Sequence, residues 1–148
     1  MEFPKLKDIS IATRLFISLM LCLVGLSYLT LLLGIWIDTE MKISYIIEGY
    51  GDFEFIELVE HSFRYIFWFI GTFGITVSIF LLTAWSEKLK ILFAVAVPLL
   101  IISDVGSMWF IRYSDFFAFQ LSFSGLMLAI CFLSMFLLIQ YDLWLKKN

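Results

Sequence analysis

The chain has few charged residues, few prolines and few glycines, and each shortage excludes a class of protein. Charged residues make up 16% of its 148 residues, whereas soluble domains carry about 25%. Pro occurs twice and Gly eight times, and no stretch has the composition of a flexible linker. The net charge of −3 disfavours nucleic acid as a partner. We therefore expect one integral membrane domain over residues 1–148.

The sequence also lacks the residue sets that catalysis and structural metal sites require. Its two cysteines, Cys22 and Cys131, each lie within an apolar stretch, and no CxxC or Cys/His zinc spacing occurs. No nucleophile–base pair, phosphate-binding loop or metal triad has a workable spacing. We therefore expect reduced, packed cysteines and no catalytic residues, and the balance leans against an enzyme.

Long apolar stretches are abundant, because 62% of the residues are hydrophobic. A membrane-spanning helix needs about 20 mainly apolar residues, and four stretches reach that length: 11–37, 63–85, 89–111 and 116–143. The sequence therefore predicts an all-α fold, a four-helix transmembrane bundle. The first stretch is long and has no small-residue cleavage site, so we expect it to stay as a span.

The distribution of basic residues predicts the orientation of the bundle. In the four-span topology, seven Lys or Arg residues fall on one side of the membrane and three fall on the other. Since cytoplasmic segments carry the excess of positive charge, both termini and the 86–90 hairpin are expected in the cytoplasm. The larger group is Lys5, Lys7, Arg14, Lys88, Lys90, Lys146 and Lys147, and the smaller group is Lys42, Arg64 and Arg112.

The segment 38–60, between the first two spans, is acidic and has short amphipathic stretches. It carries seven Asp or Glu residues with a single Lys. The Gly-Tyr-Gly run at 49–51 predicts a break. We expect a short extracytoplasmic amphipathic helix over 40–48, then a turn, then a second helix from residue 53 that Asp52 caps. A solvated acidic loop is the alternative.

One acidic residue lies within a predicted span. Asp104 is about 10 Å from the outer end of the third span, where a carboxylate costs roughly 3 kcal/mol or more unless it is paired or hydrated. His61 and Arg64 begin the second span on the same side, which predicts a His61–Arg64–Asp104 cluster. Its functions would be a proton or ion relay, a ligand site or the orientation of a cofactor. A buried ion pair that sets the register of two spans is the alternative.

The chain has a single histidine, His61. A membrane-bound haem b needs two axial ligands, and the chain offers His61 with Met108, or two copies of His61 in a homodimer. Haem or metal binding is therefore one hypothesis, and an interfacial histidine bonded to Glu57 or Asp104 is the other. The leading expectation is that no cofactor binds.

Small residues form one stripe on the second span and another on the third. Such stripes let helices approach closely in lipid, so we expect contacts within the bundle, or alternatively a partner subunit. Pro98 is expected to kink the third span, and Gln120 and Gln140 to form interhelical hydrogen bonds. The first stripe is Gly71, Gly74 and Ser78, and the second is Ser103, Gly106 and Ser107.

Several short motifs occur between residues 60 and 144. They are His61, Ser-Glu-Lys at 86–88, Asp-x-Gly-Ser-x-Trp at 104–109, Arg112-Tyr113 and Ser124-Gly125. With these motifs the chain resembles a set of small bacterial inner-membrane proteins with four spans. The resemblance implies that fold and location, and it implies no activity. The set is expected to have a second histidine at the position that Phe63 occupies here.

Three functions remain open. The leading one is a non-enzymatic accessory, assembly or structural subunit of a membrane complex, or a homo-oligomer, which the small-residue stripes and abundant aromatics favour. The second is a haem- or metal-linked redox protein that uses His61, with Asp104 as orienter. The third is a small oligomeric transporter or channel with Asp104 and Arg64 in its path. The expected partners are lipid and either other membrane subunits or further copies of this chain.

Overall fold

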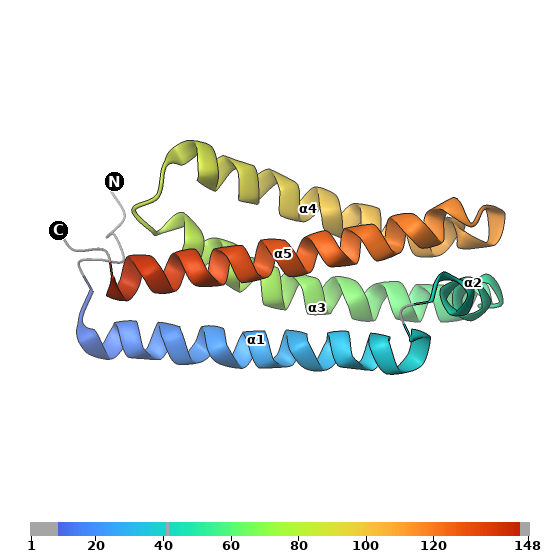
Figure 1. Ribbon diagram of the computed structural model, residues 1–148, viewed down its shortest axis with the longest axis horizontal. Helices are drawn as coiled ribbons and strands as arrows, with labels where there is room; N and C mark the ends of the chain where they lie inside the picture. The colour runs from blue at the N-terminus through green and yellow to red at the C-terminus, as the bar shows by residue number, and fades with distance from the viewer. Residues whose placement is uncertain (1–8, 41, 146–148) are drawn as a thin grey trace.

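Four long helices run side by side, and a short helix lies across one end of them (Figure 1). The computed structural model describes residues 9–40 and 42–145, and within these ranges there is no strand. The predicted positions of Lys5, Lys7, Lys146 and Lys147 lie outside the described residues. The helices are α1 (Ile11–Thr39), α2 (Ile43–Gly51), α3 (Phe55–Leu81), α4 (Glu87–Phe110) and α5 (Phe116–Trp144).

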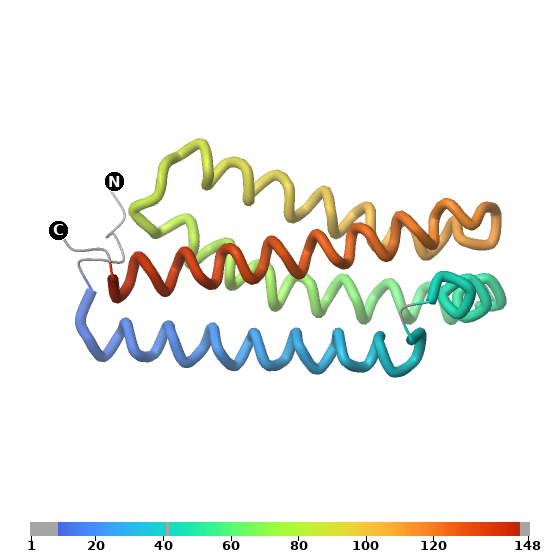
Figure 2. The backbone as a smooth tube through the Cα atoms, viewed as in Figure 1, coloured from blue at the N-terminus to red at the C-terminus, as the bar shows by residue number. Residues whose placement is uncertain are grey.

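Each long helix is long and apolar enough to cross a membrane. This confirms the predicted all-α bundle with four spans and a short helix between the first two. The start of α1, the end of α5 and the turn between α3 and α4 lie at one end of the bundle (Figure 2). The short helix α2 and the turn between α4 and α5 lie at the other end, which we call the α2 end.

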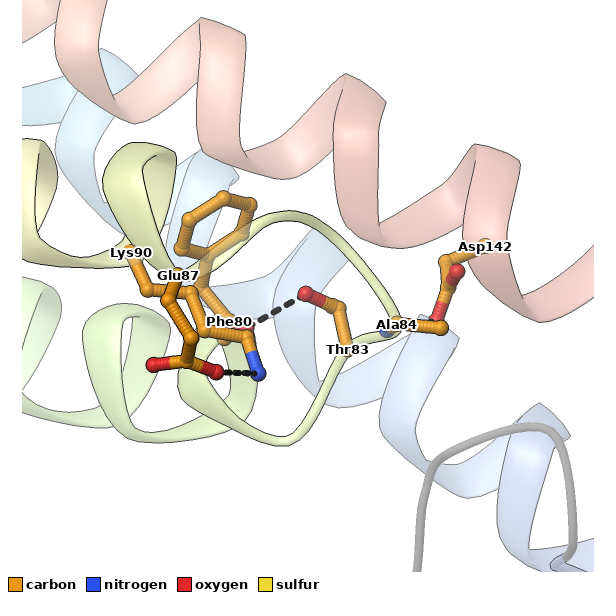
Figure 3. A network of polar contacts seen from close by, with 6 residues as sticks. All are labelled: Phe80, Thr83, Ala84, Glu87, Lys90 and Asp142. Carbon is orange, nitrogen blue, oxygen red and sulfur yellow. Dashed lines mark hydrogen bonds and ion pairs between the residues drawn. The ribbon is translucent and has the colours of Figure 1, made fainter.

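The predicted second span, 63–85, was wrong at its C-terminal limit, because α3 ends at Leu81. Hydrogen bonds hold the turn that follows, between α3 and α4 (Figure 3). The Thr83 hydroxyl donates to the Phe80 carbonyl oxygen at 2.6 Å. The Ala84 amide donates to Asp142 Oδ2 on α5 at 3.0 Å. Since Asp142 is buried, this carboxyl group holds the α3–α4 turn against α5.

The helix–turn–helix predicted for 38–60 is present with shifted bounds. The helix α2 continues through Gly49 and ends at Gly51. The predicted cap at Asp52 was wrong, because Glu54 is the N-cap of α3. Glu54 and Glu57 form a reciprocal capping box, in which the Glu57 carboxylate accepts a hydrogen bond from the Glu54 amide at 2.9 Å. This pairing satisfies two free amides at the helix start at once.

One face of α2 packs onto the end of the bundle. Ile46 from α2 is buried with Ile111 and Ala118, which flank the turn between α4 and α5. Arg112, in that turn, donates a hydrogen bond to the Phe53 carbonyl oxygen between α2 and α3. These contacts hold the two turns of the α2 end together.

The main core forms around α5. Nine residues of α5 are buried, whereas Leu21 and Tyr28 are the buried residues of α1. As predicted, two α5 glutamines form interhelical bonds: Gln120 donates to Ser103 of α4 at 3.0 Å, and Gln140 accepts from Ser18 of α1 at 3.0 Å. The helix α5 is therefore the centre of the bundle, and α1 is its most exposed member.

Two residues that could pack inside the bundle, Cys22 and Pro98, are exposed on its surface. Cys22 and Cys131 are free thiols, and Cys131 is buried while Cys22 is exposed on α1. The helix α4 continues through Pro98, which is exposed on a groove between α3 and α4. Both Cys22 and Pro98 therefore lie where lipid or another protein would contact them.

Replacement of Asp142 by Ala is expected to destabilise the bundle, because the Ala84 amide loses its hydrogen bond to α5. An intramolecular hydrogen bond contributes about 0.5–1.5 kcal/mol, so thermal unfolding in detergent should occur at a lower temperature. Asp115→Ala is the matched control, since Asp115 is exposed and its side chain makes no capping hydrogen bond. Equal unfolding temperatures for the two variants would contradict the role of Asp142.

Candidate functional site

Asp104 is buried between α4 and α5, with 4% of its surface exposed. Its Oδ1 atom lies 2.9 Å from Ser124 Oγ on α5. A Cβ atom at Gly125 would lie 3.6 Å from the same oxygen. Ser124 therefore provides a hydrogen-bonding group for the carboxyl group, and Gly125 lies at van der Waals distance from it.

Further polar contacts extend along α4 toward the α2 end. The Ser107 hydroxyl donates to the carbonyl oxygen of Ser103 at 2.6 Å, and the Ser103 hydroxyl accepts from Gln120. Trp109 Nε1 donates to Ser62 Oγ on α3 at 2.8 Å. The motif at 104–109 thus bonds α4 to both of its neighbours.

Tyrosines from the other three helices lie within electrostatic range of Asp104. Its carboxyl group acts on the hydroxyl groups of Tyr28, Tyr50 and Tyr65. Burial, and then the neighbouring Tyr65 hydroxyl, raises the pKa of Tyr50. Each of the five helices therefore contributes one oxygen-bearing side chain to what we call the polar centre. Its members are Tyr28, Tyr50, Tyr65, Asp104 and Ser124.

His61 lies beside the polar centre at the α2 end. Its ring centroid is 4.7 Å from that of Phe53, 6.3 Å from that of Tyr50 and 6.4 Å from that of Tyr65. His61 Nδ1 lies 3.2 Å from the backbone carbonyl oxygen of Glu57, one turn earlier in α3. The predicted alternative of a bond to Glu57 is thus made to its backbone.

The structure does not bring His61, Arg64 and Asp104 together as a cluster. Arg64 is exposed and lines a surface hollow with Glu60, Phe63, Phe67 and Trp68. In the described ranges, Asp104 has no ion pair with Arg64 or His61. Helix geometry explains the separation, because Tyr65 faces the polar centre and the preceding residue is rotated by about 100°.

The geometry gives no support to haem or metal binding at His61 and Met108. Met108 is buried in α4, and the ring contacts of His61 are with residues of α2, α3 and the turn between them. Across the part of the chain that the structure describes, no three His, Cys, Asp or Glu side chains are placed to hold a metal ion.

A groove with a volume of about 710 Å³ lies between α3 and α4. Gly74 and Ser78 of α3 and Gly106 of α4 are among its lining residues. A Cβ atom at Gly74 or Gly106 would meet nothing within 4 Å. Ile70 and Ile102, also in the lining, are 64% and 68% exposed. The groove is therefore apolar and open to the surroundings of the bundle.

The small-residue stripes are placed differently from the expected close contacts within the bundle. Gly71, Gly74 and Ser78 are exposed, so they make no close helix contact within the chain. The α4 stripe is divided, because Ser103 and Ser107 join the polar contacts described above while Gly106 opens onto the groove. Sequence spacing identified the small residues, but it did not determine the direction each one faces.

The three tyrosines of the polar centre were not among the predicted site residues. A signal for one of them exists, because Tyr65, Phe69 and Phe73 recur at every fourth position and their rings contact in series. Tyr28 gives a second signal, since a hydroxyl within an apolar span favours a polar partner. Neither signal identifies Asp104 as the neighbour of Tyr65 or Tyr28.

Residues 54–148 match a family model described as a transmembrane helical domain. The matched region contains α3, α4 and α5, and with them Asp104, Ser124 and the groove. No curated protein and no solved structure matches the chain.

Ser124→Ala is expected to weaken the contact between α4 and α5, because Asp104 loses its hydrogen-bonding partner. Interhelical bonds of this kind contribute about 0.6 kcal/mol on average and up to about 1.7 kcal/mol in membrane proteins. Unfolding in mixed micelles measures the loss. Ser122→Ala is the matched control, since the Ser122 hydroxyl bonds only to Ala118 in its own helix. Equal losses in both variants would count against the Asp104–Ser124 contact.

Proposed function

We propose that this chain, which belongs to the family of transmembrane helical domains matched by residues 54–148, is a non-enzymatic subunit of a membrane complex. The chain is a polytopic membrane protein. The observation that carries the proposal is the open groove between α3 and α4. We infer that a transmembrane helix of a different protein occupies it.

The size of the groove supports a helix as its occupant. Its lining runs over residues 66–78 of α3 and 97–109 of α4, which is about 18 Å or three turns of helix. The groove therefore runs along about three turns of both helices, which is the length over which a third helix could pack against them.

The small residues that line the groove support the same occupant. Gly74, Ser78 and Gly106 present little or no side chain, so the backbone of a second helix can approach closely. Glycine within a helix costs about 1 kcal/mol relative to alanine, and a close contact offsets that cost. Since nothing within the described chain fills these positions, the partner is expected to supply the contact.

The other two functions receive less support. The redox function depends on His61, whose neighbours are aromatic rings. The transport function depends on a path that includes Arg64 and Asp104, but the two side chains face different directions, Arg64 outward and Asp104 toward α5. Neither arrangement favours these functions over a subunit with an apolar docking groove.

The groove is tested by crosslinking in native membranes. A photoreactive residue at position 102, on the groove, is expected to capture a transmembrane protein other than this chain. The same residue at position 126, exposed on α5 and outside the groove, should capture none. Filling the groove with Gly74→Leu and Gly106→Leu should abolish the capture because the partner helix can no longer approach.

Gly71→Leu is the matched control for the filled groove. Gly71 lies one turn before Gly74, has nothing within 4 Å of its Cβ position, and does not line the groove. This variant should capture the partner as the unmodified chain does, with an unchanged unfolding temperature. Capture that survives the two groove substitutions, or crosslinks only to a second copy of this chain, would refute the proposed partner.

We also propose a bacterial inner-membrane location with both termini in the cytoplasm. The basic residues support this orientation, since Arg14, Lys88 and Lys90 belong to one end of the bundle, and Lys42 and Arg112 to the α2 end. The four-span resemblance supports the bacterial inner membrane.

Labelling of single cysteines tests the orientation in a chain that lacks Cys22 and Cys131. Asp115→Cys, at the exposed turn of the α2 end, should react with a membrane-impermeant maleimide in intact cells, because that end faces outward. Glu87→Cys, at the exposed opposite turn, should react only after the membrane is permeabilised. The reverse pattern would show that the bundle is inverted.

A further inference from the structure

The hydroxyl group of Ser124 has more acceptors around it than it has protons. Ser124 Oγ lies 2.9 Å from Asp104 Oδ1, 2.9 Å from the Gln120 carbonyl oxygen and 3.0 Å from the Leu121 carbonyl oxygen. A hydroxyl carries one proton and accepts through its lone pairs. If Ser124 donates to a carbonyl oxygen of its own helix, the contact with Asp104 becomes a hydrogen bond only when Asp104 carries a proton and donates it.

The groups on the other helices that lie within electrostatic or hydrogen-bonding range of Asp104 are neutral tyrosine and serine hydroxyls. They are Tyr28 from α1, Tyr50 from α2, Tyr65 from α3 and Ser124 from α5. The two arginines near the α2 end do not pair with Asp104: Arg64 is exposed, and Arg112 donates to the Phe53 carbonyl oxygen. His61 and Asp38 lie toward the α2 side, next to Tyr65 and Tyr50.

A carboxylate without a cationic partner is costly within a membrane span. A neutral carboxylic acid avoids that cost and also forms both hydrogen bonds at Ser124. Gly125 packs beside the acid, because a Cβ there would lie 3.6 Å from Asp104 Oδ1, an ordinary van der Waals distance. Burial, the two carbonyl oxygens that compete for the Ser124 proton, and the absence of an ion pair in the described residues all favour the neutral acid.

The α2 side offers a series of titratable groups for exchange of this proton. Toward the α2 end lie Tyr65 and Tyr50, and the half-exposed His61 contacts both rings. Toward the opposite end α4 and α5 bury apolar residues such as Val97 and Leu128, and the buried Thr76 hydroxyl of α3 donates to the Thr72 carbonyl oxygen of its own helix. A proton that leaves Asp104 therefore has tyrosine hydroxyls and a half-exposed histidine available on the α2 side.

We propose that Asp104 is a proton-binding site: it holds a proton as a neutral acid between α4 and α5 and exchanges it with the α2 side through Tyr65 and Tyr50. The site is separate from the groove that the proposed partner occupies, because Asp104, Ser124 and the tyrosines are not among the residues that line it. A test can therefore refute the proton-binding site without refuting the docking of a partner, and the reverse also holds.

Infrared spectroscopy of the full chain in lipid bilayers at neutral pH tests the proton. The unmodified chain is expected to show the carbonyl stretch of a protonated carboxyl group, and Asp104→Asn should lose it. Asp142→Asn is the matched control, since Asp142 is also a buried aspartate of the bundle, and it should keep the band. An unchanged band in Asp104→Asn would overturn the proposal, as would loss of the band when sodium is added at constant pH.

Solid-state NMR of the unmodified chain tests the same point without a substitution. With 13C-labelled aspartate and glycine, the aspartate signal that has a through-space contact to Gly125 belongs to Asp104. Its chemical shift should be that of a protonated acid at neutral pH. The shift of an ionised carboxylate would overturn the proposal even if Asp104→Asn failed to fold.

The exchange route is tested by transfer of the bilayer sample into D₂O. Tyr65→Phe removes one hydroxyl from the route and should slow the deuterium shift of the Asp104 carbonyl band several-fold. Tyr141→Phe is the matched control, because Tyr141 lies near the opposite end, where its ring contacts that of Trp85. Exchange at the same rate in Tyr65→Phe and the unmodified chain would overturn the route through Tyr65.

Discussion

The lack of water within a bilayer is the constraint on which this structure depends. Backbone amides and carbonyls are satisfied within helices, so the polar side chains of the spans must find partners across helix interfaces. Here they bond α5 to both α4 and α1, through Gln120 with Ser103 and Gln140 with Ser18. The same requirement places Asp104 against Ser124. These few polar contacts select which helix faces meet, since apolar side chains pack against lipid nearly as well as against one another.

Two buried aspartates meet this requirement in different ways. Asp142 accepts a hydrogen bond from a backbone amide and holds the α3–α4 turn, which is a structural role. Asp104 has no backbone donor and instead shares a serine hydroxyl with two carbonyl oxygens, with tyrosines around it. The contrast follows from their positions, because Asp142 lies beside a turn whose backbone amides are outside any helix, whereas the amides in the middle of a helix are already bonded. A buried acid in the middle of a span must therefore depend on side chains.

The helix α4 connects the polar centre with the surface of the bundle. One of its faces carries Asp104 and Ser107, and another carries Pro98, Ile102 and Gly106 on the groove. A helix that docks in the groove would therefore contact the element that holds the buried carboxyl group. Since Trp109 also bonds α4 to Ser62 on α3, a shift of α4 would alter its contacts with both α3 and α5.

The sequence by itself determined the four spans, the short helix after the first span and the presence of Asp104 at membrane depth. These depend on the length and composition of local stretches, which act before any helix meets another. Exact limits such as Glu54 and Leu81 were missed, because capping bonds and a carboxyl group from α5 decide them. Only the tertiary structure decided that Asp104 faces Ser124 and the tyrosines rather than Arg64, and that Gly74 faces outward. Contacts with all neighbouring helices together set the rotation of each helix about its axis. A local sequence pattern therefore does not determine that rotation.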